Sequence, residues 1–307
     1  MNGTAAPWPP LVSAQIANHN LAQLPRSGRV FRPIIPAHWW PASKDSINDR
    51  WKGPQEPSPA EKAERAFGLP GFVEEVSKNY GRRGARLSWE GLCHGWAIYA
   101  MTERAPLRRA TYNGVTFYPG DIEALMSFLW GSYFHSVKVD LAGEHIGHTA
   151  SGGVNPGAFH VIATNLLGRG TPFGENRSLT EVWNHPVCAF QVTDLRSVSR
   201  PAASPTAAGC YRVQTRLSCV VEAEPAEVSH VGQLARFTET DCYDYILEVD
   251  RQGNIVVPGG EWLDASRLNH PSQFWLPNGK PPPAYLDGRW PDGLTYEKLK
   301  RLNDDAA

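Results

Sequence analysis

The spacing of apolar residues changes near the middle of this 307-residue chain. In residues 122–130, large apolar side chains recur three or four positions apart, as on one face of a helix. In residues 243–249, Tyr, Tyr, Leu and Val occupy every second position, as on one face of a strand. Helix signals dominate the first half of the chain and strand signals the second. This order predicts an α+β fold with an antiparallel sheet.

Local start and stop signals locate several elements. Ser58 at an N-cap, a proline after it and Glu61 at the third helical position predict a helix that ends at Gly68. A second short helix is expected over residues 71–79. Asn113-Gly114 lies between β-forming residues and predicts a hairpin. Further expectations are strands over Phe159–Thr164, Glu181–Val192 and Ser218–Glu222, and a short helix over Tyr296–Leu302.

Composition excludes some classes of function. The chain carries 30 Lys+Arg against 31 Asp+Glu and has no long basic run, so nucleic acid and anionic membranes are not expected partners. No window approaches the ~20 apolar residues of a membrane span. The first ten residues lack the pattern of an export signal. We therefore expect a cytoplasmic protein, or a secreted one if a signal has been removed, with no cofactor.

Cys93 is the leading candidate for a nucleophile. It follows a Gly-containing turn and begins an apolar run that predicts a buried helix. The N-terminus of a helix stabilises a thiolate, which is the nucleophilic form of cysteine. The alternative is that Cys93 is a small buried core residue. His94 is a poor candidate for its base, because neighbouring helical positions point in different directions.

His160 is the candidate base. It lies in an otherwise apolar segment that we predict to be a strand, after a run of small residues. A histidine there can also be a hydrogen-bonded core residue. The order of a cysteine on a helix, a histidine on a strand and an acid or amide on the next strand favours the catalytic interpretation.

The third residue of such a triad has three candidates. If the chain turns near Gly168 and returns antiparallel to the His160 strand, Asn176 lies about opposite His160, with Glu175 beside it. Asn184 is the rival, on the extended run further along. Asparagine would fix the tautomer of the imidazole, and a glutamate would also stabilise the imidazolium.

Other polar groups near these motifs have weaker cases. The indole N–H groups of Trp89 and Trp51 are candidates to assist the backbone N–H of Cys93 in an oxyanion hole, although both side chains can equally be packing residues. Glu144, His145 and His148 lie in a Gly/His-rich loop. They are more consistent with a solvated loop than with a metal site, and we expect no metal.

Several motifs resemble the transglutaminase elicitor family, the secreted transglutaminases of oomycete plant pathogens and their bacterial relatives. Residues 182–187 read Val-Trp-Asn-His-Pro-Val and are similar to the core of the family's elicitor peptide, in which glutamine replaces His185. Residues 91–96 resemble the nucleophile motif, and residues 155–160 resemble the catalytic-histidine motif. The resemblance covers about residues 36–275.

The resemblance implies a papain/transglutaminase-like core, in which the Cys-bearing helix packs on an antiparallel β-sheet that carries His and Asn or Glu. It implies a catalytic domain over residues 36–275. Residues 1–35 are Pro- and Asn-rich with little periodicity and are expected to form an extended N-terminal arm, and residues 276–307 are expected to form a C-terminal extension. The implied reaction joins a glutamine side chain to an amine through a thioester on Cys93. The expected partners are a protein or peptide acyl donor and a primary amine. The enzyme is expected to be a monomer.

Related activities remain open at this point. With water as the acceptor, the same three residues make a cysteine protease or amidase. With a small acyl donor, they make an amide-forming biosynthetic enzyme, because groove shape and water exclusion choose the acceptor. A catalytically degenerate binding module is the non-enzymatic alternative.

Overall fold

The computed structural model describes residues 18–83, 87–132, 138–141, 153–278 and 294–307. The chain forms two compact units, each assembled from three segments. Unit 1 comprises residues 1–32, 139–219 and 238–278, and unit 2 comprises residues 33–138, 220–237 and 279–307. The expected mixture of helices and an antiparallel sheet is confirmed. The domain boundaries after residues 35 and 275 stay a prediction.

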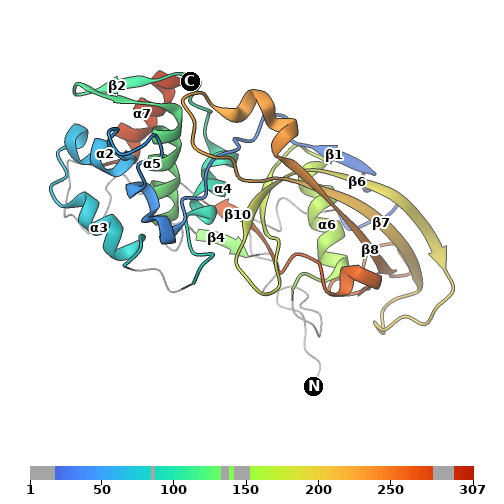
Figure 1. The fold of residues 1–307 in the computed structure, drawn as a ribbon. Coiled ribbons are helices and arrows are strands. Elements are labelled where there is room, and N and C mark those ends of the chain that lie inside the picture. Colours follow the sequence, from blue (N-terminus) through green and yellow to red (C-terminus); the bar gives the residue numbers. More distant parts are fainter. Residues whose placement is uncertain (1–17, 84–86, 133–137, 142–152, 279–293) are drawn as a thin grey trace. The chain divides into compact units, whose positions relative to one another are not determined.

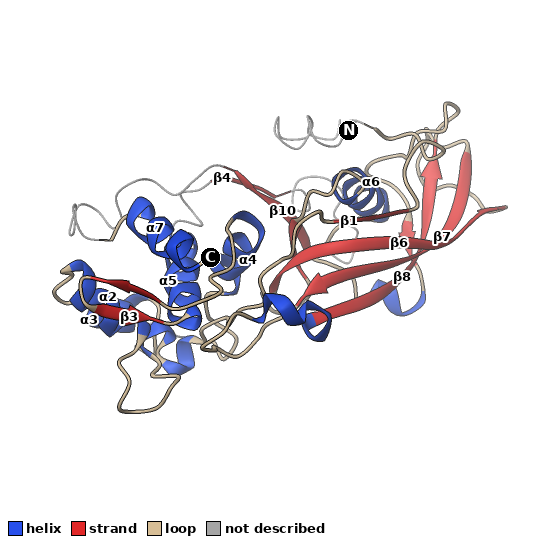
Figure 2. Ribbon diagram, turned by 90° about the horizontal axis from the view of Figure 1, so that it is seen from above, coloured by secondary structure: helices blue, strands red, loops and turns tan. Residues whose placement is uncertain are grey.

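Unit 1 is built on an eight-stranded sheet with the order β4-β10-β5-β6-β7-β8-β9, and β1 pairs with β6 outside this path (Figure 1). Strands β6, β7 and β8 are its long members (Figure 2). The strands are β1 (Ser27–Arg29), β4 (Lys138–Leu141), β5 (Phe173–Asn176), β6 (Asn184–Val198), β7 (Gly209–Val220), β8 (Thr238–Val249), β9 (Glu261–Trp262) and β10 (Gln273–Asn278).

The segment Phe159–Thr164, which we predicted as a strand, belongs instead to helix α6 (Pro156–Leu167). The side chain of Asn155 caps this helix by accepting from the amide of Ala158 at 2.9 Å, and Pro156 occupies its first turn. Periodicity alone cannot separate a buried strand from a buried helix, and all twelve residues of α6 are buried. His160 is therefore on a helix and not on the sheet.

Helix α6 packs against β1, β6 and β8 and forms the core of unit 1 with them. Phe159 lies at its centre, with its ring centroid 5.1 Å from those of Tyr243 and Trp262. Leu21 and Leu24 from the N-terminal segment also belong to this core. A short 3₁₀ helix, η4 (Asp264–Arg267), follows β9.

Unit 2 is mostly helical and contains α2 (Pro59–Phe67), α3 (Phe72–Asn79), α4 (Cys93–Thr102), α5 (Pro119–Ser132) and α7 (Tyr296–Ala306). The capping box predicted at Ser58 and Glu61 is present, and Gly68 ends α2 with a φ of 66°. Short 3₁₀ helices are η1 (Ala42–Lys44), η2 (Ser46–Asn48) and η3 (His230–Phe237). The predicted hairpin is confirmed as β2 (Ala110–Tyr112) and β3 (Val115–Phe117).

Helices α4 and α5 approach each other closely at Gly95. A Cβ atom on Gly95 would lie 2.0 Å from the carbonyl oxygen of Ser127 and 2.6 Å from the amide nitrogen of Gly131. Only glycine permits this distance between the two backbones. The glycine two residues after Cys93 therefore sets the packing of the helix that carries the cysteine.

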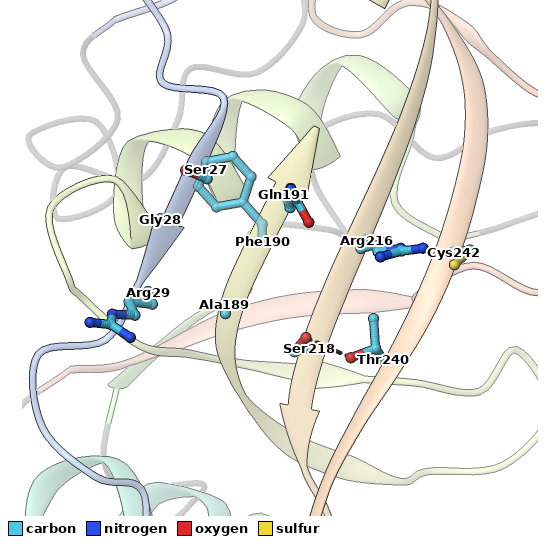
Figure 3. A pocket seen from close by; sticks show the side chains of 10 residues that line it. All are labelled: Ser27, Gly28, Arg29, Ala189, Phe190, Gln191, Arg216, Ser218, Thr240 and Cys242. Atoms are coloured by element: carbon cyan, nitrogen blue, oxygen red, sulfur yellow. Dashed lines mark hydrogen bonds between the residues drawn. The ribbon is translucent and has the colours of Figure 1, made fainter. Parts of the chain in front are cut away.

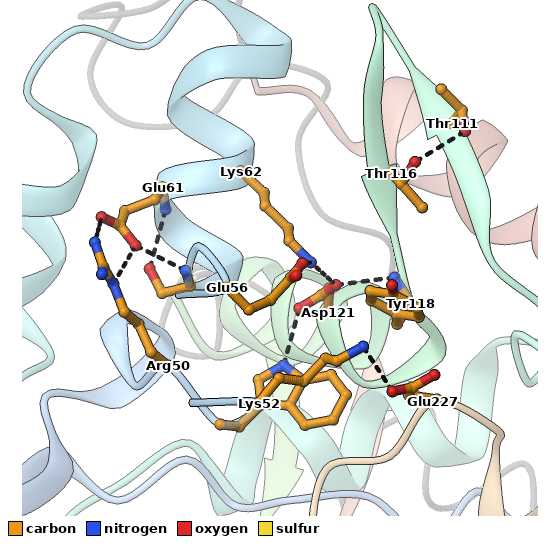
Figure 4. A network of polar contacts seen from close by, with 12 residues as sticks. Arg50, Lys52, Glu56, Glu61, Lys62, Thr111, Thr116, Tyr118, Asp121 and Glu227 are labelled. Carbon is orange, nitrogen blue, oxygen red and sulfur yellow. Dashed lines mark hydrogen bonds and ion pairs between the residues drawn. The ribbon is translucent and has the colours of Figure 1, made fainter. Parts of the chain in front are cut away.

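A buried ionic network joins α2 to α5 (Figure 4). Lys62 Nζ lies 2.6 Å from both Asp121 Oδ2 and Glu56 Oε1, and the Lys62 and Asp121 side chains are almost fully buried. Asp121 also accepts from the indole of Trp51 at 2.9 Å. Burial raises the pKa of Asp121, and the contact with Lys62 opposes this rise. The network fixes the position of the first turn of α5.

The predicted C-terminal helix is confirmed as α7 and is an integral part of unit 2. Its Asn303 accepts from the hydroxyl of Tyr99 on α4 at 3.1 Å, and its Tyr296 donates to Glu103 at 2.7 Å. Among the described helices, none combines the length and apolar composition that a membrane crossing requires.

Candidate functional site

Cys93 is the first residue of α4 in unit 2 and is 3% exposed. The preceding residue, Leu92, has no side-chain hydrogen bond that caps the helix. The first-turn backbone N–H groups of α4 therefore receive no capping hydrogen bond from the Leu92 side chain, and the N-terminal end of a helix favours a negatively charged group. This is the local arrangement that the sequence predicts for Cys93.

The turn before α4 is held by backbone contacts within unit 2. The amide of Leu92 donates to the carbonyl of Trp39 at 2.6 Å, and a Cβ atom on Gly91 would lie 2.5 Å from the Trp39 ring. A cavity of about 180 Å³ opens beside this turn, lined by residues that include Glu90, Gly91 and Leu92. His94 also lines it, and its Nε2 lies 3.3 Å from the carbonyl of Gly131.

His160 lies in unit 1, at the buried centre of α6. Its Nδ1 is 2.7 Å from the hydroxyl of Tyr245 on β8, which is in turn 2.7 Å from the hydroxyl of Thr215 on β7. Burial lowers the pKa of His160 to about 3, and the charge of Arg26 adds to this effect. The imidazole is therefore neutral near pH 7 and belongs to a Thr215–Tyr245–His160 chain.

Asn176 and Asn184, two of the candidates for the third residue, form hydrogen bonds with groups other than His160. Asn176 Nδ2 donates to Ser272 Oγ at 2.7 Å, and Asn176 Oδ1 accepts from the amide of Trp183 at 2.7 Å. Asn184 Oδ1 accepts from the indole of Trp275 at 2.9 Å. Because His160 is on a helix, the strand register that placed Asn176 opposite it does not exist. Asn176 pairs with Asn184 and Gln273 instead.

Glu175 belongs to a separate buried cluster in unit 1. It is 1% exposed and lies opposite His185 in the β5–β6 ladder, and its Oε2 is buried without a hydrogen-bond partner among the described residues. Burial raises the pKa of Glu175 to about 7, while His185 and Arg177 oppose the rise. Burial likewise raises the pKa of Cys219, so this thiol remains protonated.

The two tryptophans proposed for an oxyanion hole differ in their surroundings. The indole N–H of Trp51 donates to Asp121, so it is committed to the ionic network of unit 2. Trp89 is half-buried in the turn before α4. Of the two, Trp89 is the one that stays close in sequence to Cys93.

Cys93 thus lies in unit 2, whereas His160 and all three candidates for the third residue lie in unit 1. Tyr245 and Thr215 were missed by sequence reasoning, although the alternation around Tyr243 and Tyr245 marks this face of β8. Glu144, His145 and His148 lie outside the described residues. Within the described ranges, no group of three or more His, Cys, Asp or Glu side chains is arranged to hold a metal ion.

A solved structure shares this architecture. The crystal structure of the GP42 transglutaminase from Phytophthora sojae matches with a TM-score of 0.83 and 28% identity, over 96% of each chain. A comparison with curated proteins finds no match. The mixed helix and sheet fold is therefore that of a transglutaminase-like protein.

The family follows from the sequence itself. The model of the transglutaminase elicitor family matches residues 14–88 and 85–307. The chain belongs to the transglutaminase elicitor family, which confirms the resemblance seen in the motifs.

Proposed function

We propose that this protein is an acyltransferase of the transglutaminase type, with Cys93 as its nucleophile. It would join a glutamine-like acyl donor to a primary amine, releasing ammonia. The family membership and the likeness to a solved transglutaminase support the reaction class. The observation that carries the choice of residue is the position of Cys93 in the first turn of α4.

The proposed reaction has two half-reactions. The Cys93 thiolate attacks the carboxamide carbon, the C–N bond breaks, and ammonia leaves with a proton, which gives a thioester. The amine then attacks the thioester, loses a proton and restores the thiolate. The backbone N–H of Cys93, with Trp89 as a proposed second donor, would stabilise the oxyanion in both steps.

His160 is the proposed proton carrier, with Asn176, Glu175 or Asn184 to orient it. A histidine whose pKa is about 3 is a weak base at neutral pH, and efficient general bases have pKa values near the working pH. The proposal therefore requires that substrate binding raises the pKa of His160. The hydroxyl of Tyr245, 2.7 Å from His160 Nδ1, holds the ring in its present orientation.

The test is an assay with a glutamine-containing protein and a fluorescent primary amine. We expect covalent labelling, release of ammonia, and a thioester adduct on Cys93 in the intact mass. Cys93→Ala should lower the labelling rate by about a thousandfold or more. The matched control is Cys242→Ala, which removes an exposed thiol and should leave the rate unchanged.

Other outcomes of this assay contradict the proposal. Cleaved peptides without labelling would identify a hydrolase with the same nucleophile. Labelling that survives Cys93→Ala would exclude Cys93. The proposed monomer is checked separately by size-exclusion chromatography with light scattering. The predicted cytoplasmic location stays a prediction, since the family resemblance favours secretion.

A binding module without catalysis is the second candidate. The burial of His160 in a neutral, hydrogen-bonded state favours the binding module, because a purely structural histidine in the core of unit 1 would have the same surroundings. Reaction with iodoacetamide separates the two functions. A nucleophile at Cys93 should react faster than the buried Cys188, Cys210 and Cys219, and equal rates would support the binding module.

A further inference from the structure

A hollow of about 750 Å³ lies on the sheet of unit 1 (Figure 3). Its size is within the range of typical ligand sites. Side chains from four strands, β1, β6, β7 and β8, line it, and it is formed by unit 1 alone. The lining residues that the argument uses are Ser27, Arg29, Gln191, Arg216, Ser218 and Thr240.

The ladder register arranges these side chains in two rows. In the first row, Ser27 pairs with Gln191, which pairs with Arg216. In the second row, Arg29 pairs with Ala189, which pairs with Ser218. The hydroxyls of Ser218 and Thr240 are 2.8 Å apart at the floor. The side chains between the two long arginines are small and polar, and the space above them forms the hollow. Their hydroxyl and amide groups can form hydrogen bonds with a peptide backbone.

Arg29 and Arg216 differ from other arginines of this sheet in their partners. Arg196 lies 3.2 Å from Asp194, and Arg212 lies 2.6 Å from Asp244. Within the described residues, neither Arg29 nor Arg216 has an acidic partner, and both are exposed. Two guanidinium groups that have no acidic partner among the described residues produce a positive potential in the hollow, which attracts an anionic ligand.

The two arginines are too far apart to share one small anion. They are two strands apart and offset by two residues, which corresponds to a separation of roughly 12 Å between their Cα atoms. Their side chains extend in opposite directions, that of Arg216 toward Cys242 (Figure 3). An extended peptide advances about 3.3 Å per residue, so carboxylates four residues apart span a comparable distance.

We propose that this hollow binds an extended acidic peptide segment, whose carboxylates pair with Arg29 and Arg216. Guanidinium groups bind carboxylates through paired hydrogen bonds, and the floor hydroxyls and the Gln191 amide would bond to the peptide backbone. The site is independent of the acyl transfer proposed for Cys93. Its occupant needs no glutamine and undergoes no reaction.

Cys242 provides a reporter for occupancy. It lines the hollow, and it is the exposed cysteine among the five, so alkylation of this residue can be followed by peptide mass. The probe is acetyl-Glu-Gly-Ser-Gly-Glu-amide, and acetyl-Ser-Gly-Ser-Gly-Ser-amide is the neutral control. In low salt, we expect the acidic peptide to slow the reaction of Cys242 with iodoacetamide at least fivefold, and the neutral peptide to leave it unchanged.

The variants identify the residues. Arg29→Gln and Arg216→Gln should each raise the peptide concentration for half-protection by about fivefold, the scale of one exposed charge pair. Arg196→Gln is the matched control, because Arg196 is an exposed arginine of the same sheet that already has an acidic partner. The peptide concentration for half-protection of Cys242 should be the same in this variant as in the unmodified protein. All variants are checked by circular dichroism.

Four results would overturn the proposal. They are no protection of Cys242, equal protection by the neutral peptide, equal protection by inorganic phosphate at the same concentration, and protection that survives in both Arg29→Gln and Arg216→Gln. Because the probe contains no glutamine and Cys93 is intact, none of these results depends on whether the protein is an acyltransferase.

Discussion

The hydroxyl of Tyr245 bridges two buried polar groups, His160 Nδ1 and Thr215 Oγ1, at 2.7 Å each. Tyr245→Phe removes both hydrogen bonds and leaves His160 Nδ1 and Thr215 Oγ1 buried without this partner. We expect the free energy of unfolding in urea to fall by about 1–3 kcal/mol. The matched control is Tyr243→Phe, on the same face of β8, for which the described residues provide no hydroxyl partner. Equal losses in the two variants would contradict the bridging role.

The neutral state of His160 predicts a pH dependence of stability. The pKa is about 3 in the folded protein and near 6.5 in the unfolded chain, so between these values the unfolded chain binds a proton that the folded protein does not. This contribution is complete above pH 6.5 and is lost as the pH falls, by up to about 1.4 kcal/mol per pH unit.

His160→Gln should remove that contribution. We expect the variant to lose less stability than the unmodified protein between pH 6.5 and pH 4, as measured by urea unfolding. His230→Gln is the control, because His230 belongs to η3, which has no buried residues. If His160→Gln keeps the full acid sensitivity, His160 is charged in the folded protein and the description of its environment is wrong.

Glu123 in unit 2 predicts a pH dependence of stability that is opposite in sign to that of His160. Burial raises the pKa of this glutamate on α5 to about 8, although Ser229 donates to it at 3.2 Å. The folded protein holds a proton that the unfolded chain releases above about pH 4.5, so this stabilisation is lost as the pH rises through 8. Glu123→Gln should flatten the loss of stability between pH 6 and pH 9. Glu297→Gln, on the exposed face of α7, should not.

At the scale of elements, the crossing of α4 and α5 depends on Gly95. A methyl group there would overlap the backbone of α5, because the nearest atoms are 2.0 and 2.6 Å from the added Cβ. We expect Gly95→Ala to lower the free energy of unfolding by about 1–3 kcal/mol or more. Gly232→Ala is the control, since a Cβ at Gly232 meets no atom within 4 Å. A melting temperature unchanged by Gly95→Ala would contradict the close crossing.

Elements with clear end signals were predictable from the sequence. Ser58, Glu61 and Gly68 define α2 through backbone hydrogen bonds that local residue types dictate. The hairpin at Asn113-Gly114 follows from positive φ values of 47° and 75°, which these two residues tolerate. Such signals depend on near neighbours in the chain and need no knowledge of tertiary packing.

Helix α6 was the element that sequence reasoning assigned wrongly. Its residues are buried on every side, including the polar His160, Thr164 and Asn165, so neither helical nor strand periodicity is visible. The start signal was present in Asn155-Pro156, an N-cap followed by a proline at the first position. The error carried over to the candidate site, because the choice of Asn176 depended on a strand at His160.

At the scale of the whole molecule, the sequence predicted the family and the position of Cys93 on a helix. It could not predict that the chain passes between two units several times, so that Cys93 and His160 belong to different units. Contacts between distant segments decide that division, and no local pattern records them. The hydrogen bond between Tyr245 and His160 joins residues 85 positions apart, and no local pattern in the sequence predicts it either.

The interleaved chain predicts how unit 2 responds to loss of its C-terminal segment. Helix α7 buries Tyr296, Leu299 and Leu302, and the amides of Leu107 and Arg108 donate to the carbonyl of Ala306. Removing residues 294–307 uncovers the face of α5 on which α7 packs, and it removes the hydrogen-bond partners of Tyr99 on α4 and of Glu103 directly after it. Unit 1 loses none of its strands.

We therefore expect amide hydrogen exchange in the truncated chain to accelerate at least tenfold in peptides from α4 and α5, while peptides from β7 and β8 keep their protection. Mass spectrometry of the exchanged peptides measures both regions in one sample. Arg301→Ala, on the exposed face of α7, is the control and should leave both regions protected. Equal acceleration in the two regions would show that the units unfold together. Selective acceleration in α4 would mean that the C-terminal helix maintains the segment that carries Cys93.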